Sequence, residues 1–398
     1  MKIALLTYAT KPRGSVIHTL ELAAALSALG HHVCIFALDK DGRGFEQPPP
    51  CAVQLVPAAP APQDIDVLIQ QRIQEFVDFL AQVSEQFDIY HAQDCIGANA
   101  LLKLRQQQSI PHIVRTVHHV EDYHSPYLQQ CQDKSIHQPD LCLCVSDRWQ
   151  QTLLTDYGIT APRVVNGVNL ERFSATLSGA EASLKARYGL SGAPIYLTVG
   201  GIEPRKNSIH LLQAFAQVLT CHPSAQLVIA GGATLFDYQP YRDRFFAVAK
   251  TLGIEVGQSL ILTGVVPAED LPVLYRCADV FCFPSNQEGW GLVVLEAIAS
   301  GLPVIVSDSA PFTEFLAPHQ ALWAQPDEPD TIAIAMTQAV SHDCQPMIER
   351  SRTILPRYSW QQSAKLHEIQ YRQLMLPRSG SHFPPQRESP KSQKTWHR

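Results

Sequence analysis

The alternation of strand and helix patterns along the 398 residues predicts two doubly wound α/β domains that face each other across a cleft. In the first half, short apolar runs such as residues 3–7 and 33–38 alternate with amphipathic segments such as residues 15–29. The alternation begins again at residues 195–199, after a loose stretch over residues 166–183. Because the chain is too long for one ordinary domain, each half is expected to build its own parallel sheet, covered by helices on both faces.

The first half is expected to form a domain of residues 1–165. The expected strands cover residues 3–7, 33–38, 53–56, 88–92, 112–117, 141–145 and 163–165. The expected helices cover residues 15–29, 64–87, 97–107 and 147–157. Residues 40–50 and 120–138 are expected to be irregular loops that build an acceptor pocket.

The second half is expected to form a domain of residues 166–356. The expected strands cover residues 195–199, 226–230, 260–263, 280–283 and 304–306, and the expected helices cover residues 207–219, 241–252 and 268–277. A final helix within residues 357–376 follows Pro356 and is expected to pack back across the hinge. Residues 377–398 hold five Lys or Arg and one Glu among Ser, Gln and Pro, a composition typical of a disordered basic tail.

Composition and charge exclude several classes of protein. Hydrophobic residues make up 45% of the chain and charged residues 17%, which supports full-size cores and excludes a disordered protein. The net charge of −6 disfavours nucleic acid as a partner. Ten cysteines occur without a Cys-x-x-Cys pair, which indicates free thiols in a reducing compartment and not a disulfide framework or a zinc site.

The N-terminus and the hydropathy favour a cytoplasmic location. Met1 begins a short apolar run that ends before Tyr8, and this run is expected to be the first strand and not a signal peptide. Since no run of about 18 apolar residues occurs, no membrane span is expected. Peripheral association at the inner membrane face stays open as an alternative, because a lipid acceptor would require it.

The segment from Glu288 to Glu296 predicts a binding site for a sugar nucleotide. It holds Gly289 and Gly291 in a loop that follows the expected strand 280–283 and precedes a helix. A helix N-terminus beside a glycine-rich loop attracts phosphate, because free backbone N–H groups and the positive end of the helix dipole face the anion. The two flanking carboxylates can then accept hydrogen bonds from the hydroxyls of the molecule that carries the phosphate.

The first loop disfavours a nicotinamide-dependent dehydrogenase. Residues 7–15 follow the first expected strand and contain a single glycine, Gly14, with no Gly-x-Gly-x-x-Gly pattern. Without those glycines the backbone cannot approach a dinucleotide pyrophosphate in the usual way.

Further motifs follow one another in a characteristic order along the chain. They occupy residues 13–15, 91–94, 116–119, 166–173, 199–207, 263–265, 271–279 and 284–297. In this order they resemble the retaining GT-B glycosyltransferases of glycosyltransferase family 4, and the resemblance covers roughly residues 1–375. It implies a GT-B fold whose second domain holds a nucleotide-diphospho-sugar, linked to UDP, GDP or ADP, while the first domain holds the acceptor.

The resemblance also assigns roles within the segment from Glu288 to Glu296. It implies that Glu288 contacts hydroxyls of the donor sugar and that Glu296 holds the ribose of the nucleotide. A solvated loop residue is the alternative for Glu288, and a structurally paired buried carboxylate is the alternative for Glu296. The backbone N–H groups expected to face sugar and phosphate are those of Gly289, Trp290, Gly291 and Leu292.

A cation is expected beside the donor diphosphate. Lys206 is the candidate, because departure of the nucleotide develops negative charge that a cation stabilises. The family usually has an arginine a few residues earlier, but this chain has Gly201 there. Arg205 is expected to supply the second cation; the alternative is a surface arginine before a helix.

Titratable residues gather where an expected strand of the first domain ends. His118 follows this strand directly, and the resemblance implies that it touches the transferred sugar near its reacting centre. His119 and Glu121 are expected on the acceptor side, and Glu121 or Asp122 is a candidate acceptor base. Together with His124 these side chains could hold a metal, but the resemblance implies that no divalent cation is needed.

Three more residues are candidates in the first domain. Gly14 would let backbone N–H groups approach the donor phosphate; a plain turn glycine is the alternative. His91 and Asp94 end another expected strand and are expected to orient the acceptor, although Asp94 could instead cap the following helix.

These expectations describe a metal-independent retaining glycosyltransferase without a cofactor. It would move a sugar by front-face transfer to an acceptor hydroxyl on a small molecule, glycan or lipid, with no enzymic nucleophile. A sugar-nucleotide epimerase or phosphorylase on the same fold, or a non-catalytic sugar-nucleotide or carbohydrate-binding protein, are the alternatives, because a fold does not dictate an activity. The oligomeric state is not predicted.

Overall fold

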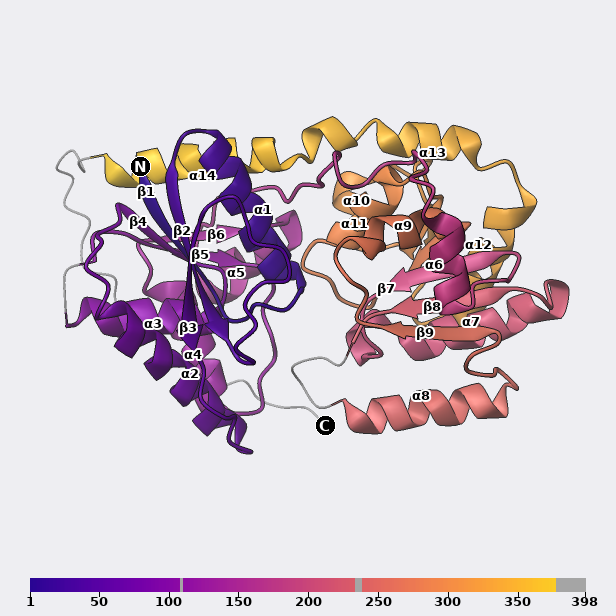
Figure 1. Ribbon diagram of the computed structural model, residues 1–398, viewed down its shortest axis with the longest axis horizontal. Helices are drawn as coiled ribbons and strands as arrows, with labels where there is room; N and C mark the ends of the chain where they lie inside the picture. Colours follow the sequence, from indigo (N-terminus) through magenta and orange to yellow (C-terminus); the bar gives the residue numbers. More distant parts are fainter. Residues whose placement is uncertain (108–109, 233–237, 377–398) are drawn as a thin grey trace.

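The computed structural model describes residues 1–107, 110–232 and 238–376 and contains two six-stranded sheets (Figure 1). The first has the strand order β3-β2-β1-β4-β5-β6, and the second has the order β9-β8-β7-β10-β11-β12. All pairs are parallel. The two orders are the same doubly wound topology, which confirms the prediction of two Rossmann-like domains. Each order reverses beside its first strand, and ligands bind beyond the carboxyl ends of strands at such a reversal.

The strands agree closely with the apolar runs of the sequence. The first sheet consists of β1 (Lys2–Thr7), β2 (His32–Asp39), β3 (Ala52–Pro57), β4 (Ile89–Ala92), β5 (Ile113–Val117) and β6 (Leu141–Cys144). The second consists of β7 (Ile195–Val199), β8 (Gln226–Ala230), β9 (Leu260–Gly264), β10 (Val280–Phe283), β11 (Val304–Ser307) and β12 (Leu322–Ala324).

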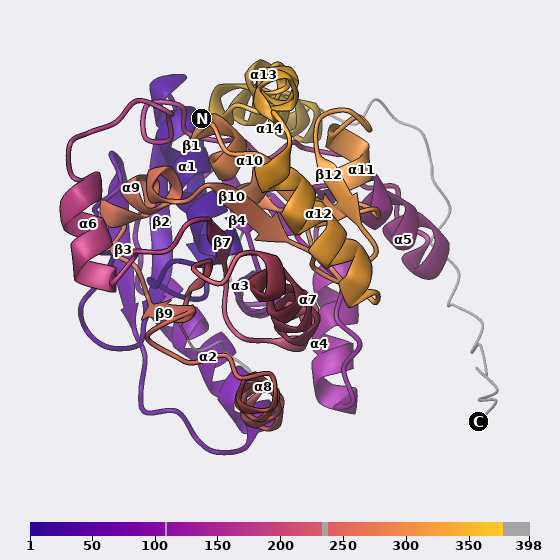
Figure 2. The same ribbon diagram turned by 90° about the vertical axis from the view of Figure 1, so that its right-hand side faces the viewer.

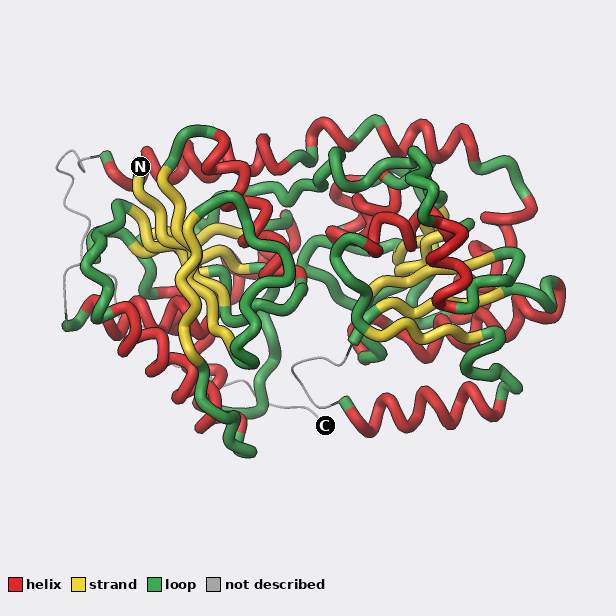
Figure 3. The backbone as a smooth tube through the Cα atoms, in the orientation of Figure 1, coloured by secondary structure: helices red, strands yellow, loops and turns green. Residues whose placement is uncertain are grey.

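The helices lie on both faces of each sheet (Figure 3). The first domain contains α1 (Gly14–Ala28), α2 (Ile65–Leu80), α3 (Cys95–Arg105), α4 (Pro126–His137) and α5 (Asp147–Tyr157). The second contains α6 (Glu181–Tyr188), α7 (Ser208–Cys221), α8 (Gln239–Thr251), α9 (Asp270–Cys277), α10 (Leu292–Ala299), α11 (Phe312–Phe315), α12 (Pro329–Ser341) and α13 (Gln345–Arg352). The last helix, α14 (Trp360–Met375), follows a short 3₁₀ turn, Leu355–Arg357.

Each sheet is the middle layer of its domain. In the first domain, α1 and α14 share one apolar core with the sheet, and α2 and α3 share another core on the opposite face. In the second, α7 and α12 pack side by side on one face (Figure 2), while α9 and α10 cover the other. Burial on both faces explains why the strands are nearly continuous apolar runs.

Two helices lie in segments that were expected to be irregular. α4 lies within residues 120–138, where Ser125 caps the helix by accepting a hydrogen bond from the backbone N–H of Leu128 at 3.2 Å. α6 overlaps the loose stretch of residues 166–183 at residues 181–183 and buries only Leu184. The prediction was wrong for both because short polar helices with few buried residues leave a weak apolar period.

Two boundaries also differ from the prediction. α2 ends at Leu80 and does not continue to residue 87, because Phe87 turns back onto the core that α2 covers. Residues 163–165 do not form a strand; Arg163 makes only an isolated bridge with Cys144. The expected tail at residues 377–398 lies outside the described residues.

The chain passes between the two domains twice, and the two crossings pack together. The backbone N–H of Val168 donates to the carbonyl oxygen of Tyr358 at 3.0 Å, and Val168 forms an isolated parallel bridge with Ser359. Gly167 is so close to the second crossing that a Cβ on it would lie 2.3 Å from the backbone nitrogen of Trp360. No side chain fits there, so this position requires glycine.

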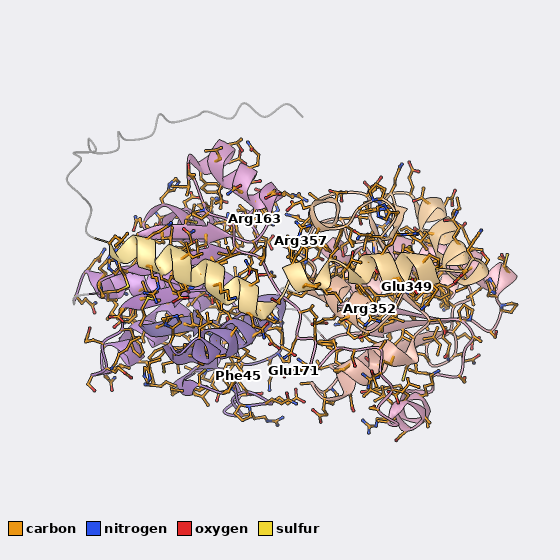
Figure 4. The ribbon with its side chains drawn as sticks, turned by 90° about the horizontal axis from the view of Figure 1, so that it is seen from above. Phe45, Arg163, Glu171, Glu349, Arg352 and Arg357 are labelled. Carbon is orange, nitrogen blue, oxygen red and sulfur yellow. The ribbon has the colours of Figure 1, made fainter. Side chains whose placement is uncertain are left out.

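After the second crossing, α14 runs over the first domain (Figure 4). Trp360, Ala364 and Tyr371 of this helix are buried in the core that α1 shares with the first sheet. The C-terminal helix therefore belongs structurally to the domain that begins the chain. The proposed domain boundaries at residues 166 and 357 lie at the two crossings.

Two further properties follow from the described residues. All ten cysteines are free thiols, as the sequence predicted. Within residues 1–107, 110–232 and 238–376, no helix is both long and apolar enough to span a bilayer.

We predict that Gly167→Ala destabilises the protein by about 3 kcal/mol, because the new methyl group would overlap backbone atoms that cannot move independently. The thermal unfolding midpoint should fall by about 5 °C or more. Gly14→Ala is the matched control, since a Cβ on Gly14 meets nothing within 4 Å. Equal midpoints for the two variants would show that the crossings do not constrain each other.

Candidate active site

The loops that follow β5 and β10 meet between the two sheets. A Cβ on Gly289 would lie 2.4 Å from the carbonyl oxygen of His118, so the backbones of the two domains touch at this glycine. Next to it, the Nε1–H of Trp149 donates to the carbonyl oxygen of Glu288 at 3.3 Å. The structure thus brings together Glu288, Gly289 and His118, which were expected at one site from separate motifs.

Arg205 and Lys206 converge on Glu288. The Nζ of Lys206 lies 2.6 Å from Oε1 of Glu288, and Nη1 of Arg205 lies 3.0 Å from the same oxygen. Nη2 of Arg205 also lies 3.0 Å from Oε1 of Glu203. The Glu288 side chain is only 8% exposed and that of Lys206 14% exposed, whereas Arg205 is 36% exposed, so this cluster of two cations and two carboxylates is buried on one side and open at Arg205.

Local backbone structure explains how both cations reach the carboxylate. Arg205 and Lys206 lie in a single 3₁₀ turn, Pro204–Lys206, which Asn207 ends in the left-handed conformation with φ 60°. The side-chain amide of Asn207 donates to the carbonyl oxygens of Pro284 and Pro326, which fastens this turn to the loops after β10 and β12.

The charges in this cluster shift each other's ionisation. Burial alone would raise the pKa of Glu288, but the charges of Lys206 and Arg205 outweigh burial and hold that pKa below its ordinary value. Burial lowers the pKa of Lys206, and the charge of Arg205 adds to this effect, while Glu288 only partly opposes it. The formal charges of Lys206 and Arg205 are balanced by those of Glu288 and Glu203.

The N-terminus of α10 has no side-chain cap. Gly291 precedes the helix with φ 98°. The Trp290 side chain is buried, with its ring centroid 4.9 Å from that of Phe315 and 5.3 Å from that of Tyr358. Only the backbone of Trp290 is therefore available to a ligand, and its ring stabilises the loop.

Glu296 lies inside α10 and its carboxylate has a hydrogen-bond partner. Its side chain is 8% exposed, and the Tyr275 hydroxyl donates to Oε2 at 2.8 Å. Burial raises the pKa of Glu296 to about 7; the Tyr275 hydrogen bond and the charge of Arg172 oppose the rise without cancelling it. The geometry fits the structurally paired alternative, and the contact with the ribose stays a prediction.

His118 is a neutral imidazole directly after β5, at the carboxyl edge of the first sheet. Its Nε2 lies 3.1 Å from Oε1 of Gln93, and its ring meets that of His18 edge-on at 4.7 Å between centroids. Burial, together with the charges of His18 and Arg115, keeps the pKa of His118 well below 6.5. The ring can therefore exchange hydrogen bonds with a sugar but carries no charge at neutral pH.

His91 is held inside the first domain, and its expected role in orienting the acceptor stays a prediction. It is fully buried; its Nδ1 lies 2.6 Å from the Tyr371 hydroxyl and its Nε2 lies 2.7 Å from the Thr116 hydroxyl. Both ring nitrogens are thus used to join β4 to α14 and β5. Asp94 caps α3, as the alternative held, by accepting from the backbone N–H of Gly97 at 2.7 Å.

His119 and Glu121 form a partly exposed ion pair at 2.9 Å. Its hydrogen bond with His119 lowers the pKa of Glu121, and Arg205 of the other domain acts in the same direction. Gln132 of α4 holds this loop by accepting from the backbone N–H of Glu121 at 2.9 Å. Among the residues that the structure describes, no three His, Cys, Asp or Glu side chains are grouped to hold a metal ion.

Several contributing residues were missed by the sequence analysis. Two of them, Glu203 and Asn207, belong to the motif of residues 199–207 that contains Lys206. Gln93 belongs to the motif of residues 91–94. Their place in these motifs could have identified them as candidates. Trp149 had no such signal, because its contact with Glu288 joins residues 139 positions apart. Gly14 begins α1, whose N-terminus has no side-chain cap; its role at the donor phosphate stays a prediction.

We predict that Glu296→Gln changes the pH dependence of stability. The folded-state pKa of about 7 lies above the ordinary value of 4.5, so protonation stabilises the fold fully below pH 4.5, and this stabilisation is lost as pH rises through 7. Glutamine has no proton to lose. Between pH 5 and pH 8 the variant should therefore gain up to about 3 kcal/mol relative to the wild type.

Thermal unfolding midpoints of both proteins across this pH range provide the measurement. Glu349→Gln, which alters an exposed glutamate, is the control and should follow the wild-type curve. Parallel curves for Glu296→Gln and the wild type would contradict the raised pKa.

Two family models match this chain in succession. The model described as Glycosyltransferase Family 4 matches residues 12–172, and the model described as Glycosyl transferases group 1 matches residues 182–354. An uncharacterised glycosyltransferase of Methanocaldococcus jannaschii is 26% identical over 398 aligned residues, which cover 92% of this chain and 96% of the relative.

Solved structures share the fold over nearly the whole chain. Sucrose-phosphate synthase of Thermosynechococcus elongatus has a TM-score of 0.76 and 23% identity, covering 94% of this chain and 98% of its own. HepE of Anabaena in complex with UDP and glucose has a TM-score of 0.75 and 17% identity, covering 94% of this chain and 100% of its own. This chain therefore belongs to the GT-B glycosyltransferases of the family 4 type and is an enzyme that transfers sugars.

Proposed function

We propose that this enzyme moves a sugar from a nucleotide-diphospho-sugar to an acceptor hydroxyl, with retention of configuration and without a metal ion. The observation that carries the donor assignment is the convergence of Lys206 and Arg205 on Glu288, which lies in the loop before α10. Two cations, a glycine-rich loop and an uncapped helix N-terminus are the features that bind a diphosphate.

The cations have a role in the chemical step. As the bond between the sugar and the diphosphate breaks, negative charge grows on the leaving phosphate, and Lys206 and Arg205 would stabilise it. Their two charges could supply the neutralisation that a divalent cation supplies in other transferases. Arg205 thus takes the place of the cation that is absent at Gly201.

Glu288 would exchange partners when the donor binds. Its carboxylate shares Oε1 between both cations; once a diphosphate attracts these cations, the carboxylate can accept hydrogen bonds from sugar hydroxyls. Glu296 would hold the ribose in the same way, and His118 would contact the transferred sugar. In this scheme the donor phosphate accepts the proton of the acceptor hydroxyl, and Glu121 is the other candidate base.

A donor screen tests the proposal. UDP-, GDP- and ADP-sugars are added with and without a panel of acceptor alcohols, and nucleotide release and the anomeric configuration of the product are measured. The UDP bound by HepE makes UDP-glucose the first choice. Acceptor-dependent release with retained configuration supports the proposal. Inversion at C2 of the donor sugar would instead support an epimerase, and tight binding without turnover would support a binding protein.

We predict that Arg205→Ala and Lys206→Ala each lower kcat/KM at least tenfold, which corresponds to about 1.4 kcal/mol of transition-state stabilisation. Arg187→Ala is the matched control, because Arg187 pairs with Asp270 elsewhere in the same domain. Circular dichroism should show that each variant stays folded. A loss below tenfold for Arg205→Ala would mean that Arg205 does not replace the cation missing at Gly201.

A further inference from the structure

The chemistry of His118 depends on which of its two ring nitrogens carries the proton. Its pKa lies well below 6.5, so the ring is neutral. A neutral imidazole donates a hydrogen bond from one nitrogen and accepts one at the other. The two tautomers would therefore present opposite groups to a sugar hydroxyl, and the hydrogen bonds that the ring makes inside the protein select one of them.

Gln93 is the residue that selects the tautomer of His118. The Nε2 of His118 lies 3.1 Å from Oε1 of Gln93. Because an amide oxygen only accepts hydrogen bonds, Nε2 carries the proton and donates it. Nδ1 then holds the lone pair, and no residue in the described part of the chain donates a hydrogen bond to it.

His91 fixes the orientation of the Gln93 amide. The amide nitrogen of Gln93 lies 3.2 Å from Nε2 and 3.4 Å from Nδ1 of His91. Burial keeps the pKa of His91 well below 6.5, so this ring is neutral and holds a lone pair at one of the two nitrogens. An amide N–H is attracted to that lone pair, whereas an amide oxygen would be repelled by it. Gln93 therefore directs its nitrogen to His91 and its oxygen to His118.

These residues are held in place by the fold around them. Gln93 is 1% exposed, so water does not compete for its amide. The Nδ1 of His91 lies 2.6 Å from the Tyr371 hydroxyl of α14, and its Nε2 lies 2.7 Å from the Thr116 hydroxyl of β5. A continuous chain of contacts thus runs from α14 through His91 and Gln93 to His118.

The ring of His18 packs against His118 and restricts its rotation. The two rings meet edge-on, with 4.7 Å between their centroids and 79° between their planes. His18 is itself fully buried, and its Nδ1 donates to Oδ1 of Asn166 at 2.8 Å. The His118 ring is therefore packed by one fixed neighbour and hydrogen-bonded by another.

We propose that Gln93 is a positioning residue for sugar transfer, which keeps the proton of His118 on Nε2 so that Nδ1 accepts a hydrogen bond from a hydroxyl of the transferred sugar. The proposal rests on the function proposed above, because it takes His118 to contact that sugar. An acceptor at Nδ1 raises the electron density on the hydroxyl oxygen, which favours the positive charge that develops on the sugar ring in the transition state. An N–H at the same place would oppose this charge.

The tautomer of His118 can be measured in the wild type without any turnover. The protein is prepared with isotope-labelled histidine, and long-range nitrogen–proton correlation spectra are recorded at neutral pH. The signals of His118 are identified by their loss in His118→Ala. We expect a protonated Nε2 and an unprotonated Nδ1. A protonated Nδ1 would overturn the proposal and would leave the transferase function intact.

Gln93→Met tests the effect of the tautomer on catalysis, because it removes the amide and keeps a side chain of similar length. With the donor found by the screen, we expect kcat/KM to fall at least tenfold and the spectra to show both tautomers of His118. Gln320→Met is the matched control, since Gln320 is 8% exposed and bonds to the backbone of Ala317 and Arg350 in the second domain. This control should keep kcat/KM within about twofold of the wild type.

A double-mutant cycle separates positioning from a purely structural role. If Gln93 acts through His118, the two changes are not additive, and Gln93→Met should lower kcat/KM less than twofold in a His118→Ala background. Equal losses in both backgrounds would overturn the proposal, and so would a loss below twofold for Gln93→Met alone. The wild-type spectrum tests the tautomer even if Gln93→Met does not fold. Failure of the wild type to turn over any donor would instead contradict the proposed function.

Discussion

The geometry of the cleft depends on the two crossings between the domains. Gly167 packs directly on the backbone at Trp360, and Val168 pairs with the crossing that returns the chain to α14. Because no side chain fits between the two crossings, they pack directly on each other and hold the domains together as a pair of adjacent segments. The loops after β5 and β10 are thereby brought into contact, as Gly289 and His118 show, so residues from distant motifs lie together.

Contacts across the cleft add to this connection. The carboxylate of Glu314 in the second domain accepts from the backbone N–H groups of Asp147 and Arg148, at 2.7 and 2.9 Å, at the N-terminus of α5. A negative charge at a helix N-terminus is favourable because it meets free N–H groups and the helix dipole. Gly289 and His118 touch nearby. The domains also share apolar packing, because Trp149 of α5 belongs to the same buried cluster as Trp290 and Phe315 of the second domain.

The charges beside the loop before α10 are compensated within the second domain. Glu288 and Glu203 balance the formal charges of Lys206 and Arg205. Keeping the side chains of Glu288 and Lys206 away from water is expensive, so such a cluster is better explained by function than by stability.

The sequence by itself determined the two doubly wound domains, because buried parallel strands appear as apolar runs that alternate with amphipathic helices. It also predicted, through the order of their motifs, that Glu288, Lys206 and His118 lie together, and the structure brings Lys206 to Glu288 and His118 to the neighbouring Gly289. Only the tertiary structure decided that His91 is buried beneath α14, that α4 supports the loop at Glu121, and that Trp149 reaches Glu288. These facts depend on contacts between residues far apart in the chain, and local periodicity carries no information about such contacts.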